Sequence, residues 1–116
     1  MWQGMDQRRF PRVKYQCVVK LEQDGSVPIA ATTENVGLGG VCVLLERGLD
    51  IFSPVNLEIT LEDGKPAVLT GGTIVWVVHR GDLKRKAAFD TGIEFTGLSA
   101  EDKTRIEAVV DKAGAS

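Results

Sequence analysis

Alternating apolar and polar positions predict β-strands along most of the chain. From residue 13 to residue 21 every second side chain is apolar, and the same period of two recurs at 55–61 and 87–95. Other apolar runs are rich in β-branched residues and are bounded by turn dipeptides such as Asp24-Gly25. Six strands at short spacing with turn signals between them predict a β-barrel or sandwich. The expected strands cover residues 13–21, 27–33, 41–45, 55–61, 67–78 and 87–95.

Two glycine-rich stretches interrupt this pattern. Residues 34–40, Glu-Asn-Val-Gly-Leu-Gly-Gly, are expected to form a break between the second and third strands. Gly71-Gly72 falls inside the longest expected strand, where paired glycines suggest a bulge or a bend. Such a feature would curl the sheet toward a barrel.

The last segment changes to a helical period. Ser99 is a typical N-cap, and Asp102 follows it three positions later. Ile106, Val109 and Val110 then recur at helical spacing. We expect a helix over about residues 99–112 that packs this apolar stripe on the barrel.

Composition and charge narrow the class of protein. The 116 residues suffice for one domain, and no apolar run is long enough for a membrane span or a secretory signal, so we expect a cytoplasmic protein. A net charge of -2 argues against a binder of duplex nucleic acid or of an anionic membrane. The charge is unevenly placed, however, because residues 1–20 carry five basic side chains and one acidic side chain.

Few residues suggest catalysis or metal binding. Cys17 and Cys42 lie in apolar segments without metal-site spacing, and we expect them to be buried free thiols. His79 is the single histidine and falls at the end of an expected strand. No nucleophile lies beside a recognisable base, and no pair of carboxylates is spaced for acid–base work. We therefore predict that the protein is not an enzyme and holds no metal.

A basic arm before the first strand is the most distinctive feature. Arg8, Arg9 and Arg12 lie within five residues, and residues 1–12 are expected to form a flexible arm ahead of a domain at 13–113. The guanidinium group binds phosphate with two hydrogen bonds and can engage the O6 and N7 atoms of guanine together. In the glycine-rich segment, Asn35 offers an amide, and the glycines let a ligand approach the backbone.

These motifs in this order resemble the PilZ domain family, whose paired signatures are RxxxR and (D/N)xSxxG. Arg8 and Arg12 match the two arginines of the first motif, and Asn35 and Gly40 match the ends of the second. Ile74-Val75-Trp76, the segment from Thr91 to Phe95, and Leu98-Ser99 ahead of the helix extend the similarity over about residues 7–110.

The resemblance implies a six-stranded antiparallel PilZ-like barrel with a C-terminal helix, and a receptor for the bacterial second messenger cyclic di-GMP. In this family the arginine arm folds over the ligand, which often binds as two intercalated molecules. The ligand-binding residues that the resemblance implies are Arg8, Arg9, Arg12, Asn35, Gly37, Gly40 and Trp76. Because 116 residues leave no room for an output domain, the signal is expected to pass to a separate partner protein.

One position departs from the family pattern, because Gly37 replaces the serine of the second motif. Loss of its hydroxyl removes a hydrogen bond worth about 0.5–1.5 kcal/mol, or about 1.5–3 kcal/mol to a charged oxygen. This departure keeps open a PilZ-like adaptor that does not bind the nucleotide. A small binder of single-stranded nucleic acid is a further alternative.

Overall fold

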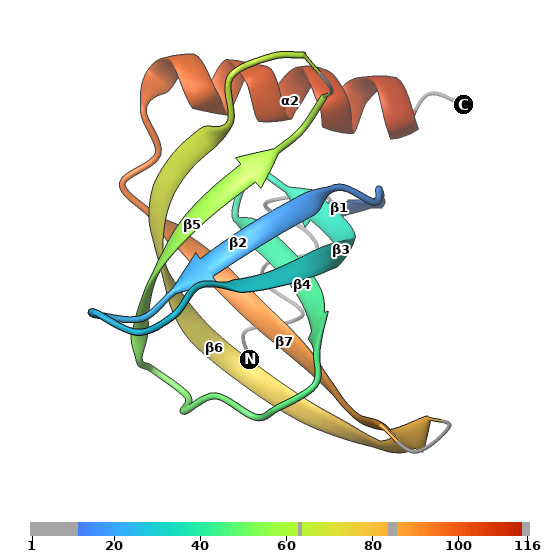
Figure 1. The fold of residues 1–116 in the computed structure, drawn as a ribbon. Helices are drawn as coiled ribbons and strands as arrows, with labels where there is room; N and C mark the ends of the chain where they lie inside the picture. The colour runs from blue at the N-terminus through green and yellow to red at the C-terminus, as the bar shows by residue number, and fades with distance from the viewer. Residues whose placement is uncertain (1–11, 63, 84–85, 115–116) are drawn as a thin grey trace.

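The computed structural model describes residues 12–62, 64–83 and 86–114. These residues form seven antiparallel strands and one helix (Figure 1). Strand β3 pairs with β2 on one side and with β4 on the other, which closes the sheet into a barrel. The elements are β1 (Arg12–Lys14), β2 (Val18–Glu22), β3 (Ile29–Gly37), β4 (Gly40–Leu45), β5 (Pro54–Thr60), β6 (Val68–Leu83), β7 (Lys86–Thr96) and α2 (Ala100–Gly114).

Strands β1 and β2 are the two parts of the predicted first strand. Both pair with β3, so the barrel has six strands when they are counted as one, as predicted. The interruption at residues 15–17 is caused by a side chain of β3. The Thr33 hydroxyl accepts a hydrogen bond from the Cys17 N–H and donates one to the Tyr15 carbonyl, replacing ladder bonds at this point.

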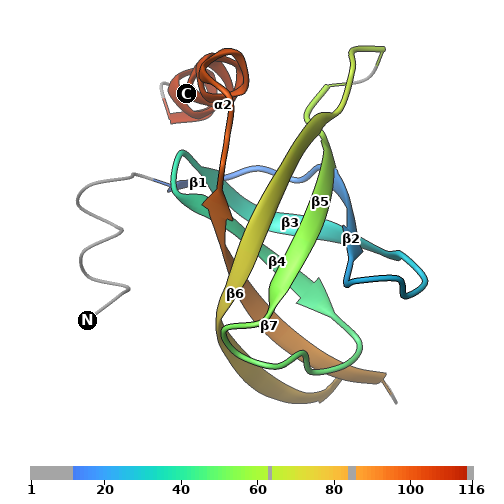
Figure 2. The same ribbon diagram turned by 90° about the vertical axis from the view of Figure 1, so that its left-hand side faces the viewer.

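The core of the barrel is filled by the alternating apolar positions that the sequence pattern predicted. Helix α2 lies across one end of the barrel and closes it with Ile106 and Val109, which are 0% and 7% exposed (Figure 2). The Ser99 hydroxyl accepts a hydrogen bond from the Asp102 N–H, which confirms the predicted N-cap. The buried side chains of the strands include Val19, Leu21, Val36, Val41, Val43, Leu57, Ile59, Ile74 and Ile93.

The glycine-rich break is shorter than predicted. Strand β3 continues through Gly37 and β4 begins at Gly40, so the turn between them consists of Leu38 and Gly39 alone. Because Asn35 and Gly37 pair with Lys14 and Arg12 of β1, this part of the segment belongs to the sheet. The prediction of a loop over residues 34–40 was therefore wrong.

Gly71 and Gly72 form no bulge, so one of the two features that the glycine pair suggested, a bulge or a bend, is excluded. Both glycines pair in regular register with β5 and β7, and β6 is irregular later, between Ile74 and Trp76 and beyond His79. A Cβ on Gly72 would come within 2.7 Å of Ile93 Cγ2. This glycine therefore allows close packing where a bulge was expected.

Candidate functional site

A β-bulge in β3 places two polar side chains on the outer face of the barrel. The pairing of β3 with β4 shifts between Thr33 and Asn35, which leaves Glu34 as the extra residue. In such a bulge two residues oppose one residue of the neighbouring strand, here Cys42. Thr33 and Val36 are buried on the inner side, so Glu34 and Asn35 both face outward.

A continuous cross-strand row of residues runs through Asn35. Each member is the pairing partner of the next, across β1, β3, β4, β7 and β6. Neighbouring strands are about 4.8 Å apart, so the two ends of the β3-to-β6 part lie about 14 Å apart. The members in order are Lys14, Asn35, Cys42, Gly92 and Trp76. We call the outer surface along this row, from the amide of Asn35 to the indole of Trp76, the platform.

The indole of Trp76 lies directly over Gly92. A Cβ added to Gly92 would overlap the Cε2 and Nε1 atoms of the ring. Trp76 is half-buried on the outer face, so it is a barrel-surface aromatic and not a core residue. Gly92 is thus required for this position of the indole.

A second row on the same face carries the motif residues Arg12, Gly37 and Gly40. Arg12 pairs with Gly37, and Gly40 pairs with Glu94, each two residues along its strand from the first row. Arg12, expected as the last residue of the arm, is the first residue of β1. Its positive charge is close enough to Cys42 to oppose the rise in the pKa of that thiol. Arg8 and Arg9 lie outside the described residues.

The side-chain carbonyl of Asn35 is buried and lacks a hydrogen-bond donor within the described part of the chain. A buried acceptor without a donor costs about 1–3 kcal/mol. A ligand or an arm residue that donates to Oδ1 would recover this cost. We therefore expect a hydrogen-bond donor to bind Asn35 Oδ1 at the platform.

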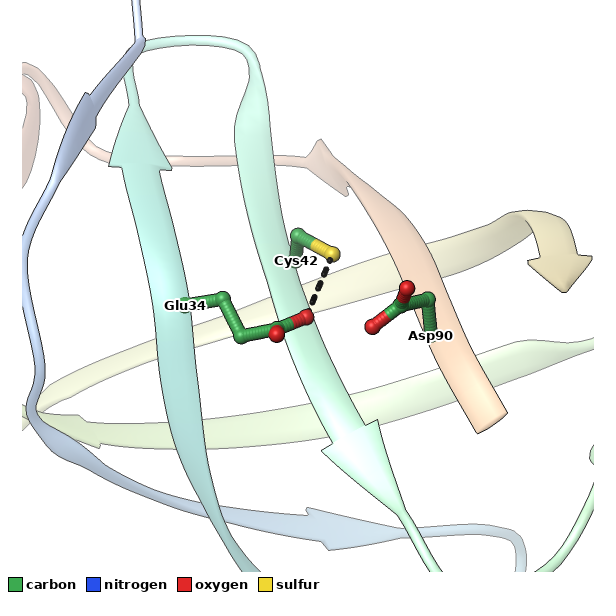
Figure 3. A group of neighbouring side chains, drawn as sticks. All are labelled: Glu34, Cys42 and Asp90. Carbon is green, nitrogen blue, oxygen red and sulfur yellow. Dashed lines mark hydrogen bonds between the residues drawn. The ribbon is translucent and has the colours of Figure 1, made fainter. Parts of the chain in front are cut away.

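Next to the platform, four polar side chains form a cluster that the sequence pattern did not indicate, and Figure 3 shows three of them, Glu34, Cys42 and Asp90. The Cys42 thiol donates a hydrogen bond of 3.5 Å to Glu34 Oε1, and the carboxylate of Asp90 faces Glu34. The guanidinium of Arg80 bridges both carboxylates, at 3.2 Å from Glu34 Oε2 and 3.5 Å from Asp90 Oδ1. The residues come from β3, β4, β6 and β7, so only the barrel brings them together.

Burial and charge hold protons in this cluster. Burial, followed by the charge of Glu34, raises the pKa of Cys42 to about 12, so the thiol is neutral at pH 7. A hydrogen bond shared with Asp90, followed by burial, raises the pKa of Glu34. One carboxylate oxygen each of Glu34 and Asp90 and the Sγ atom of Cys42 lie within 4.8 Å of one another, a spacing that would suit a cation. Arg80 already supplies the positive charge there.

The raised pKa of Glu34 predicts a pH-dependent stability. Between the ordinary carboxyl pKa of about 4.3 and the raised value, the native state keeps a proton that the unfolded state releases. Stability contributed by Glu34 is therefore lost as pH rises through this window. As pH rises above the ordinary carboxyl pKa of about 4.3, we expect the free energy of unfolding to fall less in Glu34→Gln than in wild type.

Urea denaturation at several pH values measures this difference. Glu58→Gln is the matched control, because Glu58 is exposed on β5 and its contact with Lys20 is a 4.0 Å surface pair. This control should follow the wild-type profile. If the free energy of unfolding depends on pH in the same way in wild type and in Glu34→Gln, the raised pKa of Glu34 is contradicted.

The two cysteines are placed as predicted, whereas the histidine is not at the end of a strand. Cys17 and Cys42 are both buried free thiols. His79 is exposed, but it lies within β6, which continues to Leu83, and its ring stacks on its pairing partner Phe89 at 4.7 Å between centroids. None of the described helices is long and apolar enough to cross a membrane.

Fold and surface together define a small antiparallel barrel with a polar platform on its outer face. The family model of the PilZ domain matches residues 6–112, and the chain belongs to this family. PilZ domains are receptors and not enzymes, in agreement with the prediction. A comparison with curated protein sequences gives no significant match.

Solved structures with the same fold include the PilZ domain of YcgR from Escherichia coli with c-di-GMP. That domain superposes with a TM-score of 0.75 at 13% identity, over 93% of this chain and 92% of that chain. The inhibitor of motility MotI/DgrA of Bacillus subtilis also gives a TM-score of 0.75, at 19% identity and over 90% of this chain. This chain spans 50% of MotI/DgrA, and these likenesses show the fold.

Proposed function

We propose that this PilZ domain is a receptor for cyclic di-GMP, which binds on the outer face of β3, β4, β6 and β7. The observation that carries the proposal is the convergence of three separate motifs on one face. Arg12, Asn35 and Trp76 come from different parts of the sequence and lie in two adjacent rows. Relatives of the same fold, YcgR and MrkH, have been solved with c-di-GMP.

Each of these groups suits one part of the ligand. Arginine forms charge-assisted hydrogen bonds with phosphate, and an indole can stack on a guanine ring. The buried Oδ1 of Asn35 can accept a hydrogen bond from a guanine N–H. In this proposal Arg8 and Arg9 of the arm close over the ligand, Gly37 and Gly40 leave the backbone accessible, and a separate partner protein recognises the ligand-bound surface.

Isothermal titration calorimetry with cyclic di-GMP tests the proposal. Wild type should bind saturably, and Asn35→Ala should bind about 2- to 10-fold more weakly because one uncharged hydrogen bond is lost. Asn56→Ala, at an exposed asparagine of β5, is the matched control and should bind like wild type. Cyclic di-AMP tests whether guanine is recognised.

Absence of saturable heat at high micromolar ligand would reject the receptor. It would instead favour the alternative of a PilZ adaptor without nucleotide binding, which the replacement of the motif serine by Gly37 supports. Equal affinities of wild type and Asn35→Ala would reject the site but not the ligand.

A further inference from the structure

The barrel is open between the beginning of β3 and the end of β4. Pairing of these strands stops at Thr32 and Leu44, although β3 begins three residues earlier, at Ile29. After Leu45 the chain bends at residues 46–47 and leaves β3. In both ribbon views the arrowhead of β4 and the start of β3 diverge (Figures 1 and 2).

This opening leaves backbone hydrogen-bonding groups of β3 directed outward. In an antiparallel ladder, bonded and non-bonded pairs alternate. The Thr33 N–H donates to the Cys17 carbonyl, so Ala31 is the next β3 residue bonded toward β2. Ala30 therefore directs its N–H and C=O away from β2, toward the side of β3 that faces β4. On that side no described strand pairs with β3 between Ile29 and Ala31.

A groove of about 760 Å³ occupies the opening. Its walls are mainly small or apolar, and Leu44 is 36% exposed within it. Ile29 and Ala31 are partly buried and pack against the core, so the groove reaches the edge of the barrel interior. The residues that line it are Pro28, Ile29, Ala30, Ala31, Thr32, Leu44, Leu45, Glu46 and Arg47.

Arg47 and Glu46 are the charged residues at one end of the groove, and Glu46 already takes part in a polar or electrostatic interaction. The Arg47 side chain is exposed, and no ion pair of Arg47 occurs within the described ranges. Arg80 and Arg105 are both paired with carboxylates. An acidic group at this end of an occupant would therefore find a complementary charge.

We propose that this groove binds an extended segment of a partner protein as an added β-strand. The segment pairs with the free edge at Ala30, places apolar side chains at alternate positions toward Ile29 and Ala31, and presents a carboxylate to Arg47. Strand addition of this kind uses backbone hydrogen bonds for affinity and side-chain contacts for specificity. The unpaired residues of β3, Ile29–Ala31, span about 10 Å, which is the length of a three-residue strand.

The peptide groove is separate from the proposed nucleotide site. Ala30 lies near the beginning of β3, whereas Asn35 and Gly37 lie near its end. The inference therefore does not depend on nucleotide binding, and either proposal can fail without the other.

Selection from a displayed library of random nine-residue peptides tests the groove. Enriched peptides are then labelled and measured by fluorescence anisotropy. We expect alternating apolar residues with an acidic residue, and amide chemical-shift changes at Ala30 and Leu44. Affinity should fall about tenfold in Ala30→Pro, which lacks the N–H, and in Arg47→Glu.

A control variant and a second test variant make the result specific to the groove. Lys112→Glu makes the same change of charge at an exposed position of α2 and should retain wild-type affinity. Arg47→Glu, at an exposed residue, tests the groove even if Ala30→Pro fails to fold. The proposal is overturned if the selection enriches no peptide. It is also overturned if folded Ala30→Pro or folded Arg47→Glu binds the peptides as tightly as wild type. A wild-type dimer that Ala30→Pro dissociates would also overturn it, since a second copy would then occupy the edge.

Discussion

Replacement of Arg12 by alanine is expected to weaken the binding of cyclic di-GMP about 10- to 150-fold. A hydrogen bond between charged partners contributes about 1.5–3 kcal/mol, and about 1.4 kcal/mol corresponds to a factor of ten in affinity. Arg12 begins β1 beside Gly37, on the face that carries Asn35 and Trp76. Its backbone is already ordered by the sheet, so little further ordering is needed there when ligand binds.

Calorimetric titration at two salt concentrations measures this effect. Lys20→Ala is the charge-matched control, because Lys20 is exposed on β2, away from the platform. We expect the control to lose less than twofold in affinity. A loss shared equally by Arg12→Ala and Lys20→Ala would indicate general attraction of an anion and would contradict a specific role for Arg12.

Gly40→Ala is expected to lower the free energy of unfolding by about 1–3 kcal/mol or more, because 1–3 kcal/mol is the usual cost of inserting a methyl group into a packed site. A Cβ at this position would overlap the backbone carbonyl oxygen of Ile93 on β7. The contact is with backbone that is fixed by pairing, since Gly40 lies opposite Glu94 at the start of β4. The two strands must therefore separate to admit the methyl group.

Thermal and urea denaturation measure this loss of stability. Gly48→Ala is the matched control, because its Cβ would meet only the ring of Phe89, at 3.3 Å, and a side chain can move. We expect the control to change stability by less than about 1 kcal/mol. Gly40→Ala with wild-type stability would show that the strands can separate at low cost. The glycine that ends the second motif thus has a structural role in addition to any contact with ligand.

Patterns within short segments predicted most of the fold. The alternation in β2 and β5 placed Leu21, Leu57 and Ile59 in the core because a strand orients successive side chains to opposite faces. Ser99 marked the beginning of the helix because its hydroxyl satisfies a free N–H of the first turn. These signals are local, so they required no knowledge of the neighbouring strands.

The candidate site was predicted only in part. The motif residues Arg12, Asn35 and Trp76 were identified through family resemblance, and the barrel places them on one face. The cluster around Glu34 and Arg80 was missed because these residues are 46 positions apart in sequence. Nothing near Glu34 distinguishes its carboxylate from those of an ordinary solvated strand face.

Local periods in the sequence predicted the class of fold and the helix, because each depends on the spacing of apolar side chains, and the resemblance to a known family identified the motif residues. Tertiary structure alone decided where β3 bulges, which places Glu34 beside Asn35, and where β3 and β4 part, which exposes Ala30. Both features depend on the register between strands. Register is set by the packing of all strands around one core, which no short segment of sequence contains.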